Sequence, residues 1–162
     1  MYIKRRLSES LTTFKNLRTR MTCKKKSSHR YRVIVGVGGN IGDVKRRFEH
    51  LKIFLQKDKR VDLLQISLIL KNPPFGFQSQ DDFFNSIIVV QSSMQPLIFL
   101  DYLQRVEKRF ARKRSFANAP RTLDLDIIFF DNRVINLKKL IVPHADWSQR
   151  ESVLIPLMDI DI

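Results

Sequence analysis

Two aspartates separated by a single leucine, Asp124 and Asp126, form the chain's most distinctive chemical pattern. They lie in the segment 120–130 (PRTLDLDIIFF), which is purely apolar after the second aspartate. Such β-branched and aromatic runs are typical of strands, in which residues i and i+2 point to the same face. Neighbouring carboxylates repel each other unless a cation lies between them. The pattern therefore predicts a hard-metal site, most naturally for Mg²⁺, which prefers one or two carboxylates plus substrate phosphates.

A simpler interpretation is that both aspartates belong to the solvated face of an amphipathic strand, with nearby arginines as partners. The preceding segment favours the metal site, because it is densely basic. Its cationic residues are Lys108, Arg109, Arg112, Lys113, Arg114 and Arg121. Guanidinium groups bind phosphate oxygens, and metal ions neutralise others. Together the two features indicate a binding site for a polyphosphate.

Length and composition indicate one globular domain: the chain has 162 residues, of which 43% are hydrophobic. No apolar run approaches the length of a membrane span, so no transmembrane helix is expected. The single cysteine, Cys23, cannot form an internal disulfide, which fits a reducing compartment such as the cytoplasm. The three histidines have no zinc-type spacing.

The net charge of +14 is concentrated at the N-terminus. Residues 1–30 hold ten lysines or arginines and one glutamate, a net charge of +9. Such a segment is compatible with nucleic-acid binding, with an organellar transit segment, or with a start at Met21. We favour a basic, disordered extension without function over residues 1–30. Residues 31–162 are then expected to form the single folded domain.

Hydrophobic periodicity predicts two helices and four strands in the order β-α-β-β-α-β. The strands are expected at 31–37, 61–70, 83–90 and in the segment that carries the aspartate pair. One helix follows Asp43, a predicted N-cap, and the other begins near Pro96; each has apolar residues at i, i+4, i+7 and i+11. This order predicts an α+β, ferredoxin-like fold, an antiparallel sheet with its helices packed on one face. Residues 132–162 are expected to form a short strand and loops.

Three further segments have residues suited to ligand binding. The glycine turn 36–40 (GVGGN) matches neither a P-loop nor a dinucleotide fingerprint, but it can bring backbone close to a ligand. The loop 72–77 (NPPFGF), with Phe83 and Asn85 after it, offers aromatic faces and amides that suit a flat heteroaromatic ring. The loop 142–150 has an imidazole and a guanidinium six residues apart. For single residues in these loops, an ordinary core or surface position is the competing interpretation.

Taken together, these motifs resemble the 6-hydroxymethyl-7,8-dihydropterin pyrophosphokinase family, which transfers a diphosphate from ATP to a pterin alcohol in folate synthesis. The resemblance covers about residues 31–160. It rests on the glycine turn with Asn40, the Asn-Pro-Pro-Phe-Gly loop, the Pro-Arg-Thr-Leu-Asp-Leu-Asp-Ile block and the later Val-Pro-His…Arg…Leu-Ile-Pro-Leu stretch. The block with its Pro-His segment is specific, whereas the glycine turn alone is weak.

The resemblance also implies roles for individual residues. Asp124 and Asp126 are the expected ligands of two Mg²⁺ ions that bridge the ATP phosphates. Arg112 and Arg121 are the expected phosphate-binding residues, which makes these four residues the catalytic set. The expected ATP-binding residues are Gln104, Glu107, Arg114, His144 and Arg150. The expected pterin pocket consists of Asn72, Pro73, Phe75, Phe83 and Asn85, with Asn85 hydrogen-bonding the ring. The expected partners are these two small substrates, with no nucleic acid or membrane, and the chain is expected to be a monomer.

Two positions depart from the family pattern. The family's tryptophan before the Pro-Arg pair falls on Phe116 or Asn118, and the aromatic residue expected two positions after Arg150 is Ser152. The competing class of function is a ferredoxin-like RNA-binding module with a basic tail, which has the same element order. Such modules have a Lys/Arg-Gly-Phe-type motif on their central strands, and this motif is absent here. An RNA-binding module also provides no reason for paired aspartates on a strand.

Overall fold

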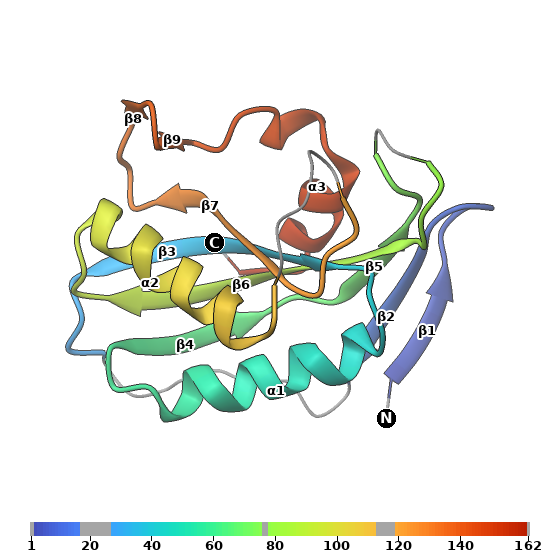
Figure 1. The fold of residues 1–162 in the computed structure, drawn as a ribbon, viewed down its shortest axis with the longest axis horizontal. Helices are drawn as coiled ribbons and strands as arrows, with labels where there is room; N and C mark the ends of the chain where they lie inside the picture. The colour runs from blue at the N-terminus through green and yellow to red at the C-terminus, as the bar shows by residue number, and fades with distance from the viewer. Residues whose placement is uncertain (1, 17–26, 76–77, 113–118, 162) are drawn as a thin grey trace.

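A computed structural model describes residues 2–16, 27–75, 78–112 and 119–161 (Figure 1). Its strands are β1 (Tyr2–Arg6), β2 (Thr12–Asn16), β3 (Tyr31–Gly39), β4 (Val61–Ile66), β5 (Ile69–Asn72), β6 (Phe83–Ser92), β7 (Asp124–Phe130), β8 (Ile135–Leu137) and β9 (Leu140–Val142). Its helices are α1 (Val44–Lys57), α2 (Pro96–Arg109), α3 (Glu151–Leu157) and a 3₁₀ turn at Trp147–Gln149. No helix within these ranges is both long and apolar enough to cross a membrane.

The central sheet has the strand order β1-β2-β5-β6-β3-β7, and β4 also pairs with β6. All pairings are antiparallel. β4 and β5 lie along the same edge of β6, and they are separated where Ile87 N–H donates to the Ser67 hydroxyl at 2.8 Å. The single strand expected at 61–70 is therefore two strands. With β4 and β5 counted as one, residues 31–130 have the predicted βαββαβ, ferredoxin-like topology.

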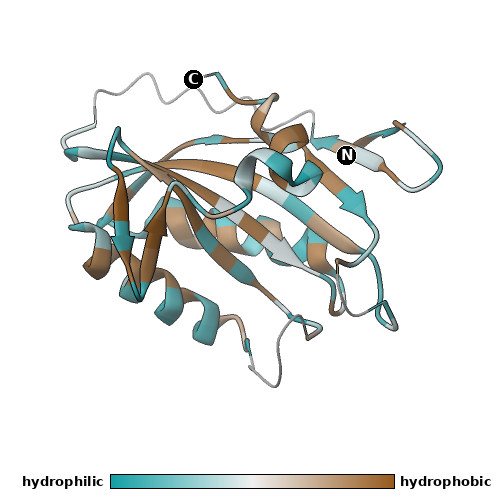
Figure 2. Cartoon of the chain, turned by 90° about the horizontal axis from the view of Figure 1, so that it is seen from above, coloured by the Kyte–Doolittle hydropathy of each residue, from teal (hydrophilic) through white to brown (hydrophobic). Residues whose placement is uncertain are grey.

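Helices α1 and α2 cover one face of the sheet, as expected (Figure 1). Asp43 caps α1 by accepting a hydrogen bond from Arg46 N–H at 3.0 Å, and Pro96 occupies the first turn of α2. The predicted apolar stripes meet the sheet, and Leu51, Leu55, Phe99 and Leu103 are almost fully buried. Figure 2 shows hydrophobic residues concentrated on the central strands, between more polar loops.

The opposite face of the sheet has a second, smaller core, which the sequence analysis does not predict. Helix α3 packs there, and Val153 and Leu157 contact Ile34, Ile87 and other residues of the sheet. The expectation of only a short strand and loops after residue 132 is therefore wrong. The sequence pattern fails here because α3 has seven residues with Pro156 inside it, and proline normally argues against a helix.

The N-terminal segment also differs from the expectation. β1 and β2 form an antiparallel hairpin, and β2 pairs with β5 at the edge of the sheet (Figure 1). The expected disorder is therefore wrong for residues 2–16, whereas residues 17–26 lie outside the described ranges. The hairpin has a weak sequence signal because four of the five residues of β1 are exposed, and three of those four are cationic.

Candidate functional site

A cavity of about 270 Å³ opens on the face of the sheet that α3 covers. Its floor comes from β3, β6 and β7, and its walls come from α3 and from the loops that contain Phe75 and His144. The cavity brings together nine of the residues singled out in the sequence: Asn72, Phe75, Phe83, Asn85, Arg121, Asp124, Asp126, His144 and Arg150. Ser152 also lines it, from the first turn of α3.

The two aspartates of β7 lie opposite glycines of β3. Asp124 pairs with Gly38 and Asp126 pairs with Gly36, and all four residues line the cavity. The expectation that both carboxylates share one face thus agrees with the structure. The glycines help to keep the floor open, because a Cβ at Gly38 would lie 3.0 Å from the Asn85 side-chain oxygen.

Two arginines bind the first of these aspartates. Arg112 Nη1 lies 2.6 Å from Asp124 Oδ1, and Arg121 Nη1 contacts Asp124 Oδ2. Arg121 also lies over the Phe83 ring, 5.3 Å from its centroid. The guanidinium of Arg121 therefore adjoins both the expected phosphate side and the expected pterin side of the cavity.

Glu107 is a third acidic group of this cluster, and it is only 3% exposed. It extends from α2 and accepts a hydrogen bond from Leu125 N–H at 2.8 Å, between the two aspartates. It also contacts Arg112. Burial raises the pKa of Glu107 to about 7, and the charge of Asp124 acts in the same direction. Glu107 does not line the cavity, so its contacts are those of a residue that positions β7 and Arg112.

Asp126 has no such arginine partner among the ion pairs of the described residues, and its side chain is accessible from the cavity. Restricted hydration within the cavity raises its pKa, and the nearby charge of Asp124 raises it further. A divalent cation would relieve this repulsion, so the two carboxylates fit Mg²⁺. Within the described ranges no group of three or more histidine, cysteine or acidic residues could hold a metal. Substrate phosphate oxygens and water would suit the remaining coordination positions of such an ion.

Amides and aromatic rings line the other end of the cavity. Asn85 Nδ2 donates to Asn72 Oδ1 at 2.7 Å, which links β5 to β6 beside Phe83. Phe75 is 81% exposed, and the guanidinium of Arg150 lies 5.8 Å from its ring centroid. The arrangement offers polar atoms at the edge of a planar ligand and, in Phe75, a largely exposed aromatic ring.

His144 and Arg150 reach the cavity from the segment that connects β9 to α3. The backbone N–H of His144 donates to Ile128 O at 3.0 Å, which fixes the segment against β7 after the cis peptide at Pro143. Arg150 Nη2 lies 3.6 Å from Asp146 Oδ2, at an exposed position. Both side chains line the cavity, and Arg150 lies there beside the Phe75 ring, at the aromatic end.

Some expected site residues lie elsewhere. Gln104, on α2, and Pro73, which is exposed, do not line the cavity. Arg112 does not line it either, although its guanidinium contacts Asp124. Arg114, Phe116 and Asn118 lie outside the described residues, so their expected roles stay predictions.

Asn40 is a positioning residue whose contacts the sequence analysis does not predict. It is 5% exposed, and its side-chain oxygen accepts a hydrogen bond from Arg121 N–H at 2.9 Å. Its amide nitrogen donates to Gln80 and to the backbone of Asp81. The preceding Gly39 allows this approach, because a Cβ there would lie 2.6 Å from Thr122 O. The Gly-Gly-Asn sequence at the end of a strand is the signal that marks this contact.

Comparisons with known proteins identify the family. The model of the family "7,8-dihydro-6-hydroxymethylpterin-pyrophosphokinase (HPPK)" matches residues 34–162. A 2-amino-4-hydroxy-6-hydroxymethyldihydropteridine pyrophosphokinase of Campylobacter jejuni is 41% identical over 130 residues, which cover 80% of this chain and 83% of the relative. Relatives with the same name from Helicobacter pylori (83% of both chains) and Bacillus subtilis (78% and 75%) are 35% and 32% identical. These findings do not support the alternative of an RNA-binding module. The chain belongs to the 7,8-dihydro-6-hydroxymethylpterin-pyrophosphokinase family.

Proposed function

We propose that the chain transfers a diphosphate group from ATP to the hydroxymethyl group of 6-hydroxymethyl-7,8-dihydropterin and releases AMP, a step of tetrahydrofolate biosynthesis. The proposal rests on family membership and on one structural observation. The cavity has the carboxylate pair and Arg121 at one end, where Arg112 also contacts Asp124, and an amide-aromatic pocket at the other. A polyphosphate with Mg²⁺ matches the first end, and a flat heterocycle matches the second.

At the polyphosphate end, Asp124 and Asp126 would hold two Mg²⁺ ions. Bound there, the ions would neutralise phosphate charge and orient the reacting oxygens. In the structure Arg112 and Arg121 contact Asp124. With Mg²⁺ bound to Asp124, both guanidinium groups would be available to phosphate oxygens. His144 and Arg150 would add positive charge or hydrogen bonds to the same nucleotide from the segment before α3.

At the pterin end, Asn85 and Asn72 would hydrogen-bond the edge of the ring, while Phe83 and Phe75 would provide its stacking faces. Ser152 stands where the resemblance expects an aromatic residue, so one face of the ring would have less aromatic cover. This assignment places the hydroxymethyl group toward Arg121, because that guanidinium lies over Phe83.

The reaction would be an in-line displacement at the β-phosphorus of ATP. The hydroxymethyl oxygen forms a bond to the β-phosphorus, and the bond from the β-phosphorus to the α,β-bridging oxygen breaks. AMP leaves with that oxygen, and the hydroxyl proton passes to solvent. Positioning and charge stabilisation supply most of the rate, because phosphoryl transfer needs little covalent participation from a protein.

The test is an assay of the purified full chain with ATP, Mg²⁺ and the dihydropterin alcohol. We expect AMP and the pterin diphosphate in equal amounts, and no AMP when either the pterin or Mg²⁺ is left out. Formation of ADP instead of AMP would show transfer of the γ-phosphate alone. Absence of any pterin-dependent product would overturn the proposal.

We further propose that the chain acts in the cytoplasm as a monomer with a single catalytic domain over residues 31–162. The family match over residues 34–162 supports the extent of the catalytic domain.

A further inference from the structure

The N-terminal hairpin of β1 and β2 lies outside the family match, which begins at residue 34. It nevertheless joins the sheet that carries the cavity, because Thr12, Thr13 and Phe14 pair with residues 69–71 of β5 (Figure 1). We propose that this hairpin positions the pterin side of the cavity. Detaching it is then expected to weaken pterin binding more than ATP binding. The inference rests on the proposed function of the cavity.

The first support is the register between β2 and β5. Thr12 pairs with Lys71, which directly precedes Asn72, and Asn72 binds Asn85 inside the cavity. β5 has only four residues and lies between β6 and the hairpin. Without β2 it would be a short edge strand that frays easily. The hairpin therefore restrains the strand that presents Asn72.

The second support is a contact with β6 from the opposite face of the sheet. The Phe14 ring lies 6.1 Å from the Phe84 ring, and the Lys45 ammonium lies 4.5 Å from the Phe14 centroid. Phe84 is located between Phe83 and Asn85, which point into the cavity. The contact between Phe14 and Phe84 therefore restrains the β6 backbone that positions Phe83 and Asn85.

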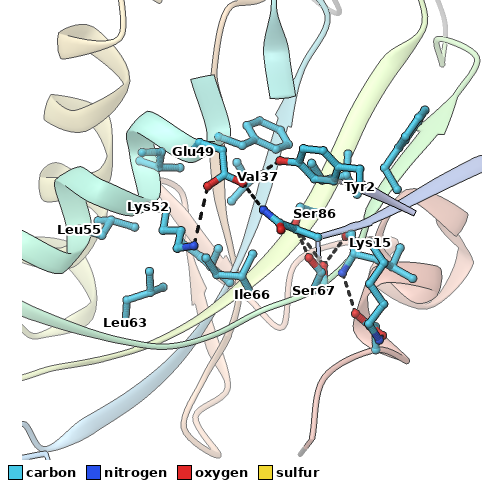
Figure 3. Close-up of a pocket in the computed structure, with 18 residues that line it drawn as sticks. Tyr2, Lys15, Val37, Glu49, Lys52, Leu55, Leu63, Ile66, Ser67 and Ser86 are labelled. Carbon is cyan, nitrogen blue, oxygen red and sulfur yellow. Dashed lines mark hydrogen bonds and ion pairs between the residues drawn. The ribbon is translucent and has the colours of Figure 1, made fainter. Parts of the chain in front are cut away.

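The third support is that the hairpin binds two further elements. Tyr2 Oη and Asn16 Nδ2 donate to Glu49 of α1 at 2.7 and 2.8 Å (Figure 3). Lys15 Nζ lies 2.5 Å from Asp159, whose other oxygen accepts from Leu68 N–H just before β5. The hairpin thus connects α1, β5 and the segment after α3, the helix that contributes Ser152 to the cavity.

A gap in the packing lies beneath the hairpin. A second cavity, of about 50 Å³, lies between the hairpin, α1 and the sheet (Figure 3). Val37 and Ser86 line this cavity and the candidate site, so a single layer of backbone separates the two. Because the cavity replaces close packing beneath the hairpin, loss of one anchoring side chain should be enough to loosen it.

The experiment compares Phe14→Ala and Glu49→Ala in the full chain with Lys4→Ala. Lys4 pairs with Phe14 across the hairpin but is exposed, which makes its variant a matched control. We expect the first two variants to raise KM for the pterin about 5- to 10-fold and KM for ATP less than 2-fold. Hydrogen exchange at residues 69–72 should quicken in both variants. Phe14→Leu should restore most of the pterin affinity, and Lys4→Ala should match the wild type.

Faster exchange at residues 69–72 with unchanged pterin KM would overturn the inference, since the hairpin would then only stabilise the sheet. An equal rise in KM for both substrates would also count against it. The wild-type assay separates this result from the proposed function: AMP formation by the wild type supports that function whatever the variants do. A wild type that forms no AMP would overturn the function itself.

Discussion

At the scale of single residues, the candidate site is a balance of close opposite charges. Asp124 has two guanidinium partners, whereas Asp126 faces the cavity with its pKa raised by restricted hydration and by Asp124. Two neighbouring carboxylates, of which only one has cationic side-chain partners, are typical of the protein part of a divalent-cation site. The two aspartates should therefore respond differently to neutralisation.

The prediction for Asp126→Asn is a large loss of activity without a loss of stability. Turnover should fall by about 100-fold or more, because one metal ligand is gone. Thermal stability should stay the same or rise, because the repulsion from Asp124 disappears. Steady-state AMP formation and thermal unfolding check both parts, with exposed Asp101→Asn of α2 as the control. Near-normal turnover in Mg²⁺ would exclude the metal role.

The prediction for Glu107 separates its charge from its hydrogen bond to β7. Glu107→Gln keeps an acceptor for Leu125 N–H but loses the charge that holds Arg112. Turnover should fall about 10- to 100-fold with little change in unfolding temperature. Glu107→Ala should in addition lower the free energy of unfolding by about 1–3 kcal/mol, because it leaves the buried Leu125 N–H without its acceptor. Urea unfolding and AMP assays distinguish the two; equal stability of both variants would contradict this assignment.

At the scale of elements, the apolar stripes pack helices against the sheet, and polar residues at the ends of helices and strands then link neighbouring elements. Asp58, just after α1, accepts hydrogen bonds from Arg60 and from Tyr102 of α2. Asn40, at the end of β3, similarly binds the backbone before β7. These contacts set the relative positions of elements whose sequence patterns say nothing about one another.

The Asp58 contact leads to a pH-dependent prediction. Hydrogen bonds from Arg60 lower the pKa of Asp58 from 3.8 to about 2. The ionised form therefore stabilises the fold above about pH 4, and this contribution is lost as the pH falls toward 2. Asp58→Asn should reduce the free energy of unfolding by about 1 kcal/mol at pH 7, since the Arg60 side chain is largely exposed.

Urea unfolding at pH 7 and near pH 2.5 tests this expectation. The difference between Asp58→Asn and the wild type should shrink at the lower pH, whereas Asp101→Asn should show no such trend. An equal loss of stability at both values would mean that the contact acts through geometry and not through charge.

At the scale of the whole molecule, the sheet separates two cores with different tasks. The larger core under α1 and α2 stabilises the fold, whereas the smaller one under α3 adjoins the candidate cavity (Figure 1). Damage to either core should destabilise the protein, but damage to the second should change substrate binding more, because α3 contributes Ser152 to the cavity.

A pair of leucine substitutions tests this division. Leu157→Ala in α3 and Leu103→Ala in α2 should each lower the free energy of unfolding by about 2–4 kcal/mol, because both side chains are buried. Leu157→Ala should raise KM for the substrates more than Leu103→Ala does, since α3 carries Ser152 and follows Arg150. Measurements well below both unfolding temperatures avoid counting unfolded protein. Equal kinetic effects would show that the sheet does not separate the two cores.

The sequence by itself determined the central fold and the carboxylate pair, because both depend on local periodicity. Apolar spacing placed α1 and α2 against the sheet, and strand alternation put Asp124 and Asp126 on one face. Only the tertiary structure decided which residues distant in the sequence contact β7 and the other elements of the site. Glu107 binds Leu125 across 18 residues, Asn40 binds Arg121 across 81, and the hairpin finds β5 some 57 residues away. No periodic pattern encodes such contacts, because they arise only when the sheet order brings remote segments together.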